Sequence, residues 1–340
     1  MIVRRHSKSY NFVGDPTTGM TFRWGTTLEG NPYYAPWPEL ADISISNHCS
    51  KNCTFCYRDS KQDNSFISID DYIFILESLK HPKWGNVFQV AIGGGEPLEH
   101  PNFIEIIEST IEYGIVPNFT TNGNLLNDRL IQSFKGKIGA VAISESSSEE
   151  IIKQKHKILT ESKIKTNIHF VLSLKTLDTA IRILRGEYNK YVNGVNGIVF
   201  LTYKPTGRAQ KDNCLRLDDS LKEFIRLVDN NNCSTRIGFD ACFVPLLLHL
   251  TKTDIRFIDP CECSYFSVYI DEKLNIKPCS FVNDENLTFN LRDYSMEIIW
   301  QNKFERYRES NNNSCRNSCK NKEFCRGKCN FFEEINLCYL

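Results

Sequence analysis

The sequence lacks an excess of charge of either sign, because 41 Lys and Arg residues balance 41 Asp and Glu residues in a chain of 340. A balanced chain has no overall field that would draw it to nucleic acid or to an anionic membrane surface. Long apolar runs are also missing, and the longest, FVPLLLHL around Leu247, is too short for a membrane span or a signal peptide. We therefore expect a cytoplasmic protein with no nucleic-acid and no membrane partner.

Cysteine is missing between Cys56 and Cys214, although the chain holds 14 cysteines. Three of them lie near position 50, and nine lie between Cys242 and Cys338. A reducing cytoplasm keeps thiols free, so such clusters indicate metal ligands and not disulfides. Cys214 and Cys233 have no partners at useful spacing and are expected to be plain thiols.

Between Glu39 and about Asn231 the sequence alternates short β-rich runs with helical patterns. Six strand-helix units predict a parallel sheet, and polar residues at the strand ends favour a partial (β/α)6 TIM-like barrel over an open Rossmann-type sheet. Ser68 is the expected N-cap of the first helix, and residues 147–161 are expected to form one helix. Three parts are predicted: a β-type cap (1–38), the α/β barrel (39–235) and a cysteine-rich α+β domain (236–340).

The stretch CSKNCTFC follows the first predicted strand and carries Cys49, Cys53 and Cys56. Thiolates are the usual ligands of a [4Fe–4S] cluster, and three of them leave one iron open. An open metal position indicates that substrate or cofactor binds there. The alternative is a zinc site that His48 or a distant residue completes.

The combination of CSKNCTFC with GGGEP at the second strand resembles the radical SAM superfamily, whose motifs are C-x3-C-x-aromatic-C and Gly-Gly-Glu. The resemblance implies that the open iron chelates the amino and carboxylate groups of S-adenosylmethionine (SAM). It further implies that Phe55 packs near the adenine and that Gly94, Gly95 and Glu96 receive the methionyl amino group. Glycines at a strand end permit close backbone approach, and a carboxylate complements an ammonium.

Other polar residues at strand ends fall where the family makes lesser SAM contacts. Ser144 is the candidate for a ribose contact. Ser144 and Asn167 could equally satisfy local hydrogen bonds, and His169 could be a core residue of its apolar strand. The other candidates for lesser contacts are Thr121, Asn122 and Gly123.

The C-terminal cysteines resemble the SPASM extension of radical SAM peptide-modifying enzymes, which holds two auxiliary [4Fe–4S] clusters. The spacing departs from that pattern by a C-x3-C pair at the start of the tail and by Leu274 in place of a glycine. The resemblance implies one cluster on Cys242, Cys261, Cys279 and Cys329, with Cys263 competing for a place. The second would be held by Cys315, Cys319, Cys325 and Cys338. A treble-clef zinc module is the alternative for the tail.

The resemblance implies an enzyme with SAM and three [4Fe–4S] clusters that abstracts hydrogen from a peptide substrate. Maturation of a ribosomally made peptide is the expected role, by a thioether or carbon–carbon crosslink or by epimerisation. Expected partners are a reducing flavodoxin or ferredoxin and a separate leader-recognition protein. The alternatives are formylglycine formation in a sulfatase, dehydrogenation of a small alcohol, and a metal-cluster scaffold without turnover.

Overall fold

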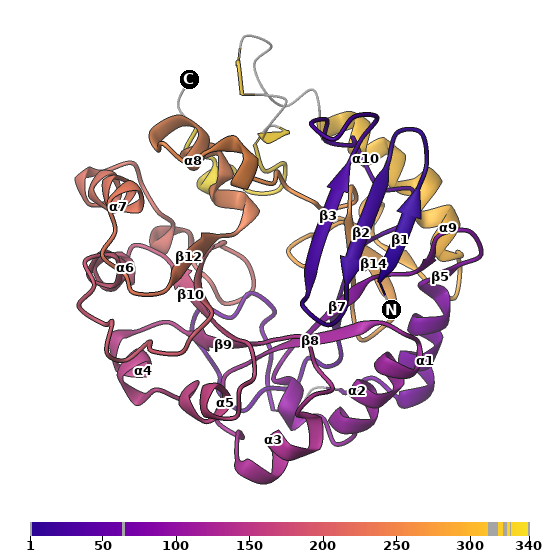
Figure 1. The fold of residues 1–340 in the computed structure, drawn as a ribbon, viewed down its shortest axis with the longest axis horizontal. Coiled ribbons are helices and arrows are strands. Elements are labelled where there is room, and N and C mark those ends of the chain that lie inside the picture. The colour runs from indigo at the N-terminus through magenta and orange to yellow at the C-terminus, as the bar shows by residue number, and fades with distance from the viewer. Residues whose placement is uncertain (1, 63–64, 312–318, 322–324, 327, 339–340) are drawn as a thin grey trace.

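The computed structural model describes residues 2–62, 65–311, 319–321, 325–326 and 328–338. Six strand-helix units form most of its main sheet: β4 (Leu40–Ser44) with α1 (Ile69–Ser78), β7 (Gln89–Gly93) with α2 (Phe103–Glu112), β8 (Val116–Thr121) with α3 (Asp128–Phe134), β9 (Val141–Glu145) with α4 (Ser148–Lys153) and α5 (Lys157–Glu161), β10 (Thr166–Leu172) with α6 (Leu177–Leu184), and β11 (Gly197–Thr202) with α7 (Asp219–Asp229). The strands pair in parallel, and the helices surround them as an outer ring (Figure 1). The predicted partial α/β barrel is confirmed.

The sheet continues beyond these six units at both ends. β12 (Arg236–Phe239) pairs in parallel with β11, and β13 (Ser267–Ile270) pairs in parallel with β4. Two antiparallel strands, β14 (Asn275–Lys277) and β15 (Phe289–Asn290), complete a ten-stranded sheet. Since the sheet crosses position 235, the boundary between the barrel and the C-terminal domain stays a prediction.

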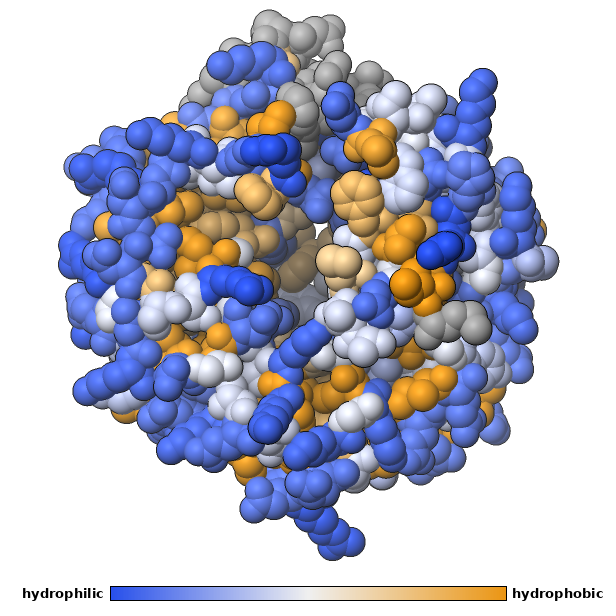
Figure 2. All heavy atoms as spheres, viewed as in Figure 1, coloured by the Kyte–Doolittle hydropathy of each residue, from blue (hydrophilic) through white to orange (hydrophobic). Residues whose placement is uncertain are grey.

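The two faces of the main sheet differ in character. Along β10, Ile168 and Phe170 are buried against α6 and α7, whereas Asn167 and His169 point the other way and are half-buried. In a strand, successive side chains alternate between the two faces. The barrel therefore has an apolar outer layer under the helices and a polar lumen, and the molecule is hollowed near its centre in Figure 2.

Local sequence signals account for the ends of several helices. Ser68 accepts a hydrogen bond from the backbone N–H of Asp71, which confirms it as the N-cap of α1. The expectation of a single helix over 147–161 is wrong: α4 ends at Lys153, its C-cap Gln154 is left-handed with a φ of 51°, and α5 begins at Lys157. A residue in that conformation terminates a helix, and nothing in its side chain announces this in the sequence.

The N-terminal strands form a separate antiparallel sheet, with β1 (Val3–His6), β2 (Asn11–Asp15) and β3 (Met20–Trp24) in that order. Arg5 donates to the carbonyl oxygens of Trp37 and Pro38 at 3.0 Å, just before β4. The ring of Phe88, just before β7, fills the space beside Gly14. This sheet therefore lies at the N-terminal ends of the barrel strands, in front of the main sheet in Figure 1.

The remaining elements are a small hairpin of β5 (Lys80–His81) and β6 (Gly85–Asn86), and the helices α8 (Val244–Leu250), α9 (Met296–Ile298) and α10 (Phe304–Asn311). Trp300, between α9 and α10, is fully buried and donates to the Ala35 carbonyl at 3.0 Å. None of the helices in the described part of the chain has the length and apolar character that crossing a bilayer requires.

Candidate active site

Cys49, Cys53 and Cys56 lie half-buried on the loop that follows β4, at the C-terminal edge of the sheet. All three thiols are free, and they are close enough to influence one another electrostatically. Burial raises the pKa of the Cys49 and Cys53 thiols, and for Cys49 the nearby carboxylates of Glu99 and Glu96 add to the rise. Thiolates at this place therefore need a compensating cation, which an iron–sulfur cluster supplies. The donor set fits the predicted cluster.

His48 is engaged elsewhere. Its Nε2 lies 3.2 Å from a carboxylate oxygen of Glu99, and its ring packs against Phe66 with the centroids 4.9 Å apart. Within the described ranges, no three Cys, His, Asp or Glu side chains converge as the ligands of a single metal ion would.

The GGGEP turn is joined to the cysteine loop backbone to backbone. The N–H of Gly95 donates to Ser46 O and the N–H of Glu96 to His48 O, both at 2.8 Å. A Cβ on Gly95 would lie 1.9 Å from His48 O, and a Cβ on Gly94, whose φ is +118°, would lie 2.2 Å from Ser46 O. The close approach expected of these glycines is thus made to the chain segment that leads into the cysteines.

Glu96 is buried, with 2% of its surface exposed. Its carboxylate accepts hydrogen bonds from the Thr121 hydroxyl at 2.5 Å, from the Asn122 N–H at 2.7 Å and from the Leu98 N–H at 3.2 Å. Burial raises the pKa of this carboxyl, and the hydrogen bonds oppose the rise. Glu96 therefore ties the end of β7 to the end of β8, and its contact with the methionyl amino group of SAM stays a prediction.

Several of the lesser candidates form local hydrogen bonds, as the plainer alternative predicted for Asn167. Thr121 and Asn122 hold Glu96, and Asn167 Oδ1 accepts from the side chain of Asn196 at 2.9 Å. A Cβ on Gly123, whose φ is +74°, would meet the side chain of Lys155. Thr121, Asn122 and Gly123 shape the C-terminal end of β8, whereas Asn167 lies near the start of β10, at the opposite edge of the sheet.

A cavity of about 430 Å³ opens beside Phe55 at the ends of β9 and β10. Its lining includes Ser146, Val171, Ser173 and Tyr203. The contact of Phe55 with an adenine stays a prediction. Ser144 does not line it, although Ser146, two residues along, does.

Two ionisable residues lie on the lumen face. Asp42 was not selected from the sequence, and His169 was only a lesser candidate there. Asp42 on β4 pairs in register with Ala91 and Tyr269, and burial raises its pKa to about 6 against the attraction of Arg58. His169 lies beside Ser144 in the register, and burial lowers its pKa to about 4. Only the alternation of strand residues could have indicated Asp42, because its position places it on the lumen face.

Two arginines hold the cysteine loop, and sequence reasoning missed both. Arg208, after β11, donates to Cys53 O at 2.9 Å, to Asp59 Oδ1 at 2.9 Å and to Ser60 O at 2.8 Å. Arg58, within the loop, donates to Glu272 Oε2 at 2.6 Å on the turn between β13 and β14. The loop is thereby fixed to both ends of the parallel sheet.

We expect Arg208→Met to loosen the cluster without unfolding the chain, since it removes three hydrogen bonds that restrain the cysteine loop. Iron should pass to an external chelator about tenfold faster, because each charge-assisted bond contributes roughly 1.5–3 kcal/mol at most. Chelation followed by absorbance measures this rate. Arg185→Met is the control, because Arg185 pairs with Glu223 on the exposed helix surface. Equal rates in both variants would refute the restraint.

The cysteines assigned to the first auxiliary cluster lie together. The thiols of Cys242 and Cys329 are both influenced by that of Cys261, and Cys329 is also influenced by Cys279. Cys263 lies close to both Cys261 and Cys279, so it competes for a place among the ligands. Five cysteines therefore share a region that a four-ligand cluster would occupy, and which four bind stays a prediction.

The structure describes three of the four cysteines predicted to hold the second auxiliary cluster. Cys315 lies outside the described residues, whereas Cys319, Cys325 and Cys338 lie within them. Cys325 is buried among the residues of α6 to α8. This ligand set also stays a prediction.

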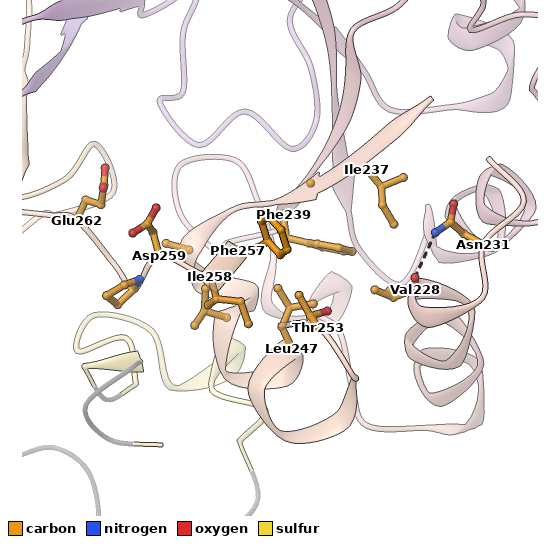
Figure 3. Close-up of a pocket in the computed structure, with 14 residues that line it drawn as sticks. Val228, Asn231, Ile237, Phe239, Leu247, Thr253, Phe257, Ile258, Asp259 and Glu262 are labelled. Atoms are coloured by element: carbon orange, nitrogen blue, oxygen red, sulfur yellow. Dashed lines mark hydrogen bonds between the residues drawn. The ribbon is translucent and has the colours of Figure 1, made fainter. Parts of the chain in front are cut away.

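A larger cavity of about 530 Å³ lies between β12, α8 and residues 253–262 (Figure 3). Phe239, Leu247 and Ile258 give it an apolar lining, and Asp259 and Glu262 lie at one end. None of the predicted SAM or metal residues lines it, but Ala241 and Pro260, which do, directly precede Cys242 and Cys261. This cavity adjoins the auxiliary cysteines and is separate from the one beside Phe55.

Several curated proteins resemble parts of this chain, two of them over about a quarter of its length. One is the tungsten-containing aldehyde ferredoxin oxidoreductase cofactor-modifying protein of Pyrococcus furiosus, which is 26% identical over 92 residues. This alignment covers 26% of this chain and 25% of that protein. The other is a probable GTP 3′,8-cyclase of Methanothermobacter marburgensis, which is 31% identical over 91 residues. This alignment covers 25% of this chain and 28% of that protein. The chain thus matches about a quarter of the length of each.

Solved structures resemble the whole fold. Streptococcus suis SuiB bound to precursor peptide SuiA matches with a TM-score of 0.69 and 16% identity, over 100% of this chain and 98% of that one. Native anSMEcpe with bound AdoMet and Cp18Cys peptide matches with a TM-score of 0.61 and 16% identity, over 86% of this chain and 89% of that one. At such identities these likenesses establish the fold alone.

A family model describes the part of the chain that builds the site. Residues 43–191 match the model of the Radical SAM superfamily. This range runs from β4 through the cysteine loop, the GGGEP turn and the strand ends that surround the cavity beside Phe55. Because the matched residues carry both motifs and the fold brings them together, the region of residues 43–191 belongs to the radical SAM superfamily.

Proposed function

We propose that this radical SAM enzyme modifies a peptide by hydrogen abstraction, in the maturation of a ribosomally synthesised peptide. The observation that carries the proposal is the cysteine loop bonded to the GGGEP turn at the mouth of a polar lumen. The fold is shared over most of the chain with two proteins whose structures hold a peptide, SuiB with SuiA and anSMEcpe with Cp18Cys. Those peptides support the substrate class proposed for this chain.

When bound, a [4Fe–4S] cluster together with SAM would supply one-electron reduction and radical hydrogen abstraction. Cys49, Cys53 and Cys56 would hold the cluster, and Phe55 would pack against the adenine. The backbone of Gly94 and Gly95 would receive the methionyl amino group, with Glu96 holding that turn in place through Thr121 and Asn122.

The chain's own residues also define the space in which a peptide would react. The lumen face carries Asp42, Asn118 and His169, and both ionisable groups have pKa values moved by burial, Asp42 upward and His169 downward. A neutral His169 and a carboxyl that titrates near pH 6 are suited to exchanging protons with a substrate. Excluding water from this space would protect a radical from side reactions.

Two auxiliary [4Fe–4S] clusters are part of the proposal, one on Cys242, Cys261, Cys279 and Cys329 and one on Cys315, Cys319, Cys325 and Cys338. Fully ligated clusters carry electrons, which suits an oxidative crosslink in which the substrate loses an electron as well as a hydrogen atom. An unligated cysteine, with Cys263 as the candidate, would suit epimerisation. A flavodoxin or ferredoxin as reductant and a separate leader-recognition protein complete the proposed partners.

The test follows 5′-deoxyadenosine release from anaerobically reconstituted protein with SAM and dithionite. Small peptides encoded beside the gene are added one at a time, and GTP is added in a parallel reaction because one curated relative is a probable GTP 3′,8-cyclase. We expect a peptide to accelerate release and to change in mass. Acceleration by GTP and by no peptide would refute the peptide proposal, and iron binding without any SAM cleavage would favour the scaffold alternative.

A further inference from the structure

A buried ion pair lies at the C-terminal ends of β11 and β12. The Lys204 ammonium donates to Asp240 Oδ2 at 2.7 Å and to Thr202 O at 2.9 Å, and the Thr202 hydroxyl donates to Asp240 Oδ1 at 2.6 Å. Lys204 is 7% exposed. Lysine is almost never buried unless it is paired, and these bonds hold both charges at fixed positions.

The surroundings of this pair are the auxiliary cysteines. The ammonium of Lys204 interacts electrostatically with the thiols of Cys242 and Cys279. Its Nζ also lies 4.4 Å from the ring centroid of Phe281, whose backbone N–H donates to Cys279 Sγ at 3.4 Å. Asp240 is two residues before Cys242 and influences that thiol as well.

The ion pair places a cation and a carboxylate side by side next to the same thiols. Burial alone would lower the pKa of the Lys204 ammonium, but the charges of Asp240 and Cys242 raise it above its usual value.

We infer that the Lys204–Asp240 pair sets the reduction potential of the auxiliary cluster on Cys242, Cys261, Cys279 and Cys329. The inference rests on the auxiliary cluster of the proposed function. Reduction adds one electron to a group that is already negative, so a nearby cation stabilises the reduced form and a nearby anion destabilises it. Lys204 raises the potential, Asp240 lowers it, and the Phe281 N–H on Cys279 acts in the same direction as Lys204.

The two charges can be removed separately, and the predicted shifts have opposite signs. Lys204→Met leaves the Asp240 carboxylate alone beside the cluster and should lower the potential. Asp240→Asn leaves the ammonium alone and should raise it. In each case we expect the ratio of reduced to oxidised cluster at a fixed potential to change about tenfold, which is 59 mV for one electron.

The experiment is a dithionite redox titration of the full-length, reconstituted protein, followed by electron paramagnetic resonance. The wave that belongs to this cluster is the one lost in Cys279→Ala. Lys137→Met is the matched control, because Lys137 forms an exposed pair with Glu108 at 2.6 Å, and its potential should equal that of the wild type.

Unchanged potentials in both variants, or shifts of the same sign, would overturn the inference. If the Lys204→Met variant loses iron, the reduction potential of the Asp240→Asn variant decides alone. A potential that falls or does not change in that variant overturns the inference. Failure of the proposed function is distinguishable: the wild type would then show no wave that depends on Cys279, and the inference would fall with it.

Discussion

Replacing Cys49, Cys53 and Cys56 together with alanine is expected to abolish SAM cleavage while the chain stays folded. The three thiols lie half-buried on a loop, outside the apolar layer that packs under the helices. Their loss removes the ligands that would hold the cluster and leaves the core intact. Bound iron should fall from about twelve to about eight per chain if two auxiliary clusters remain.

Iron and sulfide analysis, together with chromatographic detection of 5′-deoxyadenosine, measures both effects. Cys233→Ala is the control, because Cys233 packs beside a hydrophobic cluster and is not among the proposed ligands. It should keep about twelve irons and normal SAM cleavage. A triple variant that still releases 5′-deoxyadenosine would show that the reactive cluster lies elsewhere.

Gly95→Ala is expected to be the most damaging single substitution at the site. Its Cβ would lie 1.9 Å from the His48 carbonyl oxygen and 2.9 Å from the His48 nitrogen, both of them backbone atoms that cannot rotate away. Relief requires the GGGEP turn and the cysteine loop to separate, which breaks the hydrogen bonds at 2.8 Å between them. We expect the free energy of unfolding to fall by about 3 kcal/mol or more. We also expect loss of the iron–sulfur cluster that Cys49, Cys53 and Cys56 would hold.

Gly93→Ala, two residues earlier, provides the matched control. A Cβ at Gly93 meets no atom of the described chain within 4 Å. Its effect on the unfolding free energy should be within about 1 kcal/mol, and iron content should be unchanged. Anaerobic scanning fluorimetry and iron analysis compare the two variants. Equal stability of the two alanine variants would contradict the close packing at Gly95.

Much of the barrel was predictable because its signals are local. The alternation of β-rich and helical runs between Glu39 and Asn231 predicts the six units that are observed. Ser68 marks the start of α1 through its own side chain. The break at Gln154 was missed because this residue adopts a left-handed conformation without being a glycine, and composition gives no sign of that.

The edges of the sheet were not predictable from the same signals. β13 joins β4 although 227 positions separate Leu40 from Ser267, the residue with which it pairs. Strand partners that far apart are chosen by packing over the whole fold, and no short pattern encodes the choice. The sequence therefore predicted a separate C-terminal part but not the strands that it contributes to the barrel sheet.

The ligand types follow from short stretches of sequence: thiols at a C-x3-C-x2-C spacing and a glycine-rich turn before a glutamate, each a property of a few adjacent residues. The surroundings of these motifs follow from the folded chain. Arg208 reaches Cys53 across 155 positions, and Lys204, which follows β11, meets Asp240, which follows β12. Such contacts depend on how the parallel strands stack their C-terminal ends at one edge, which is a result of packing the whole sheet and not of any one segment.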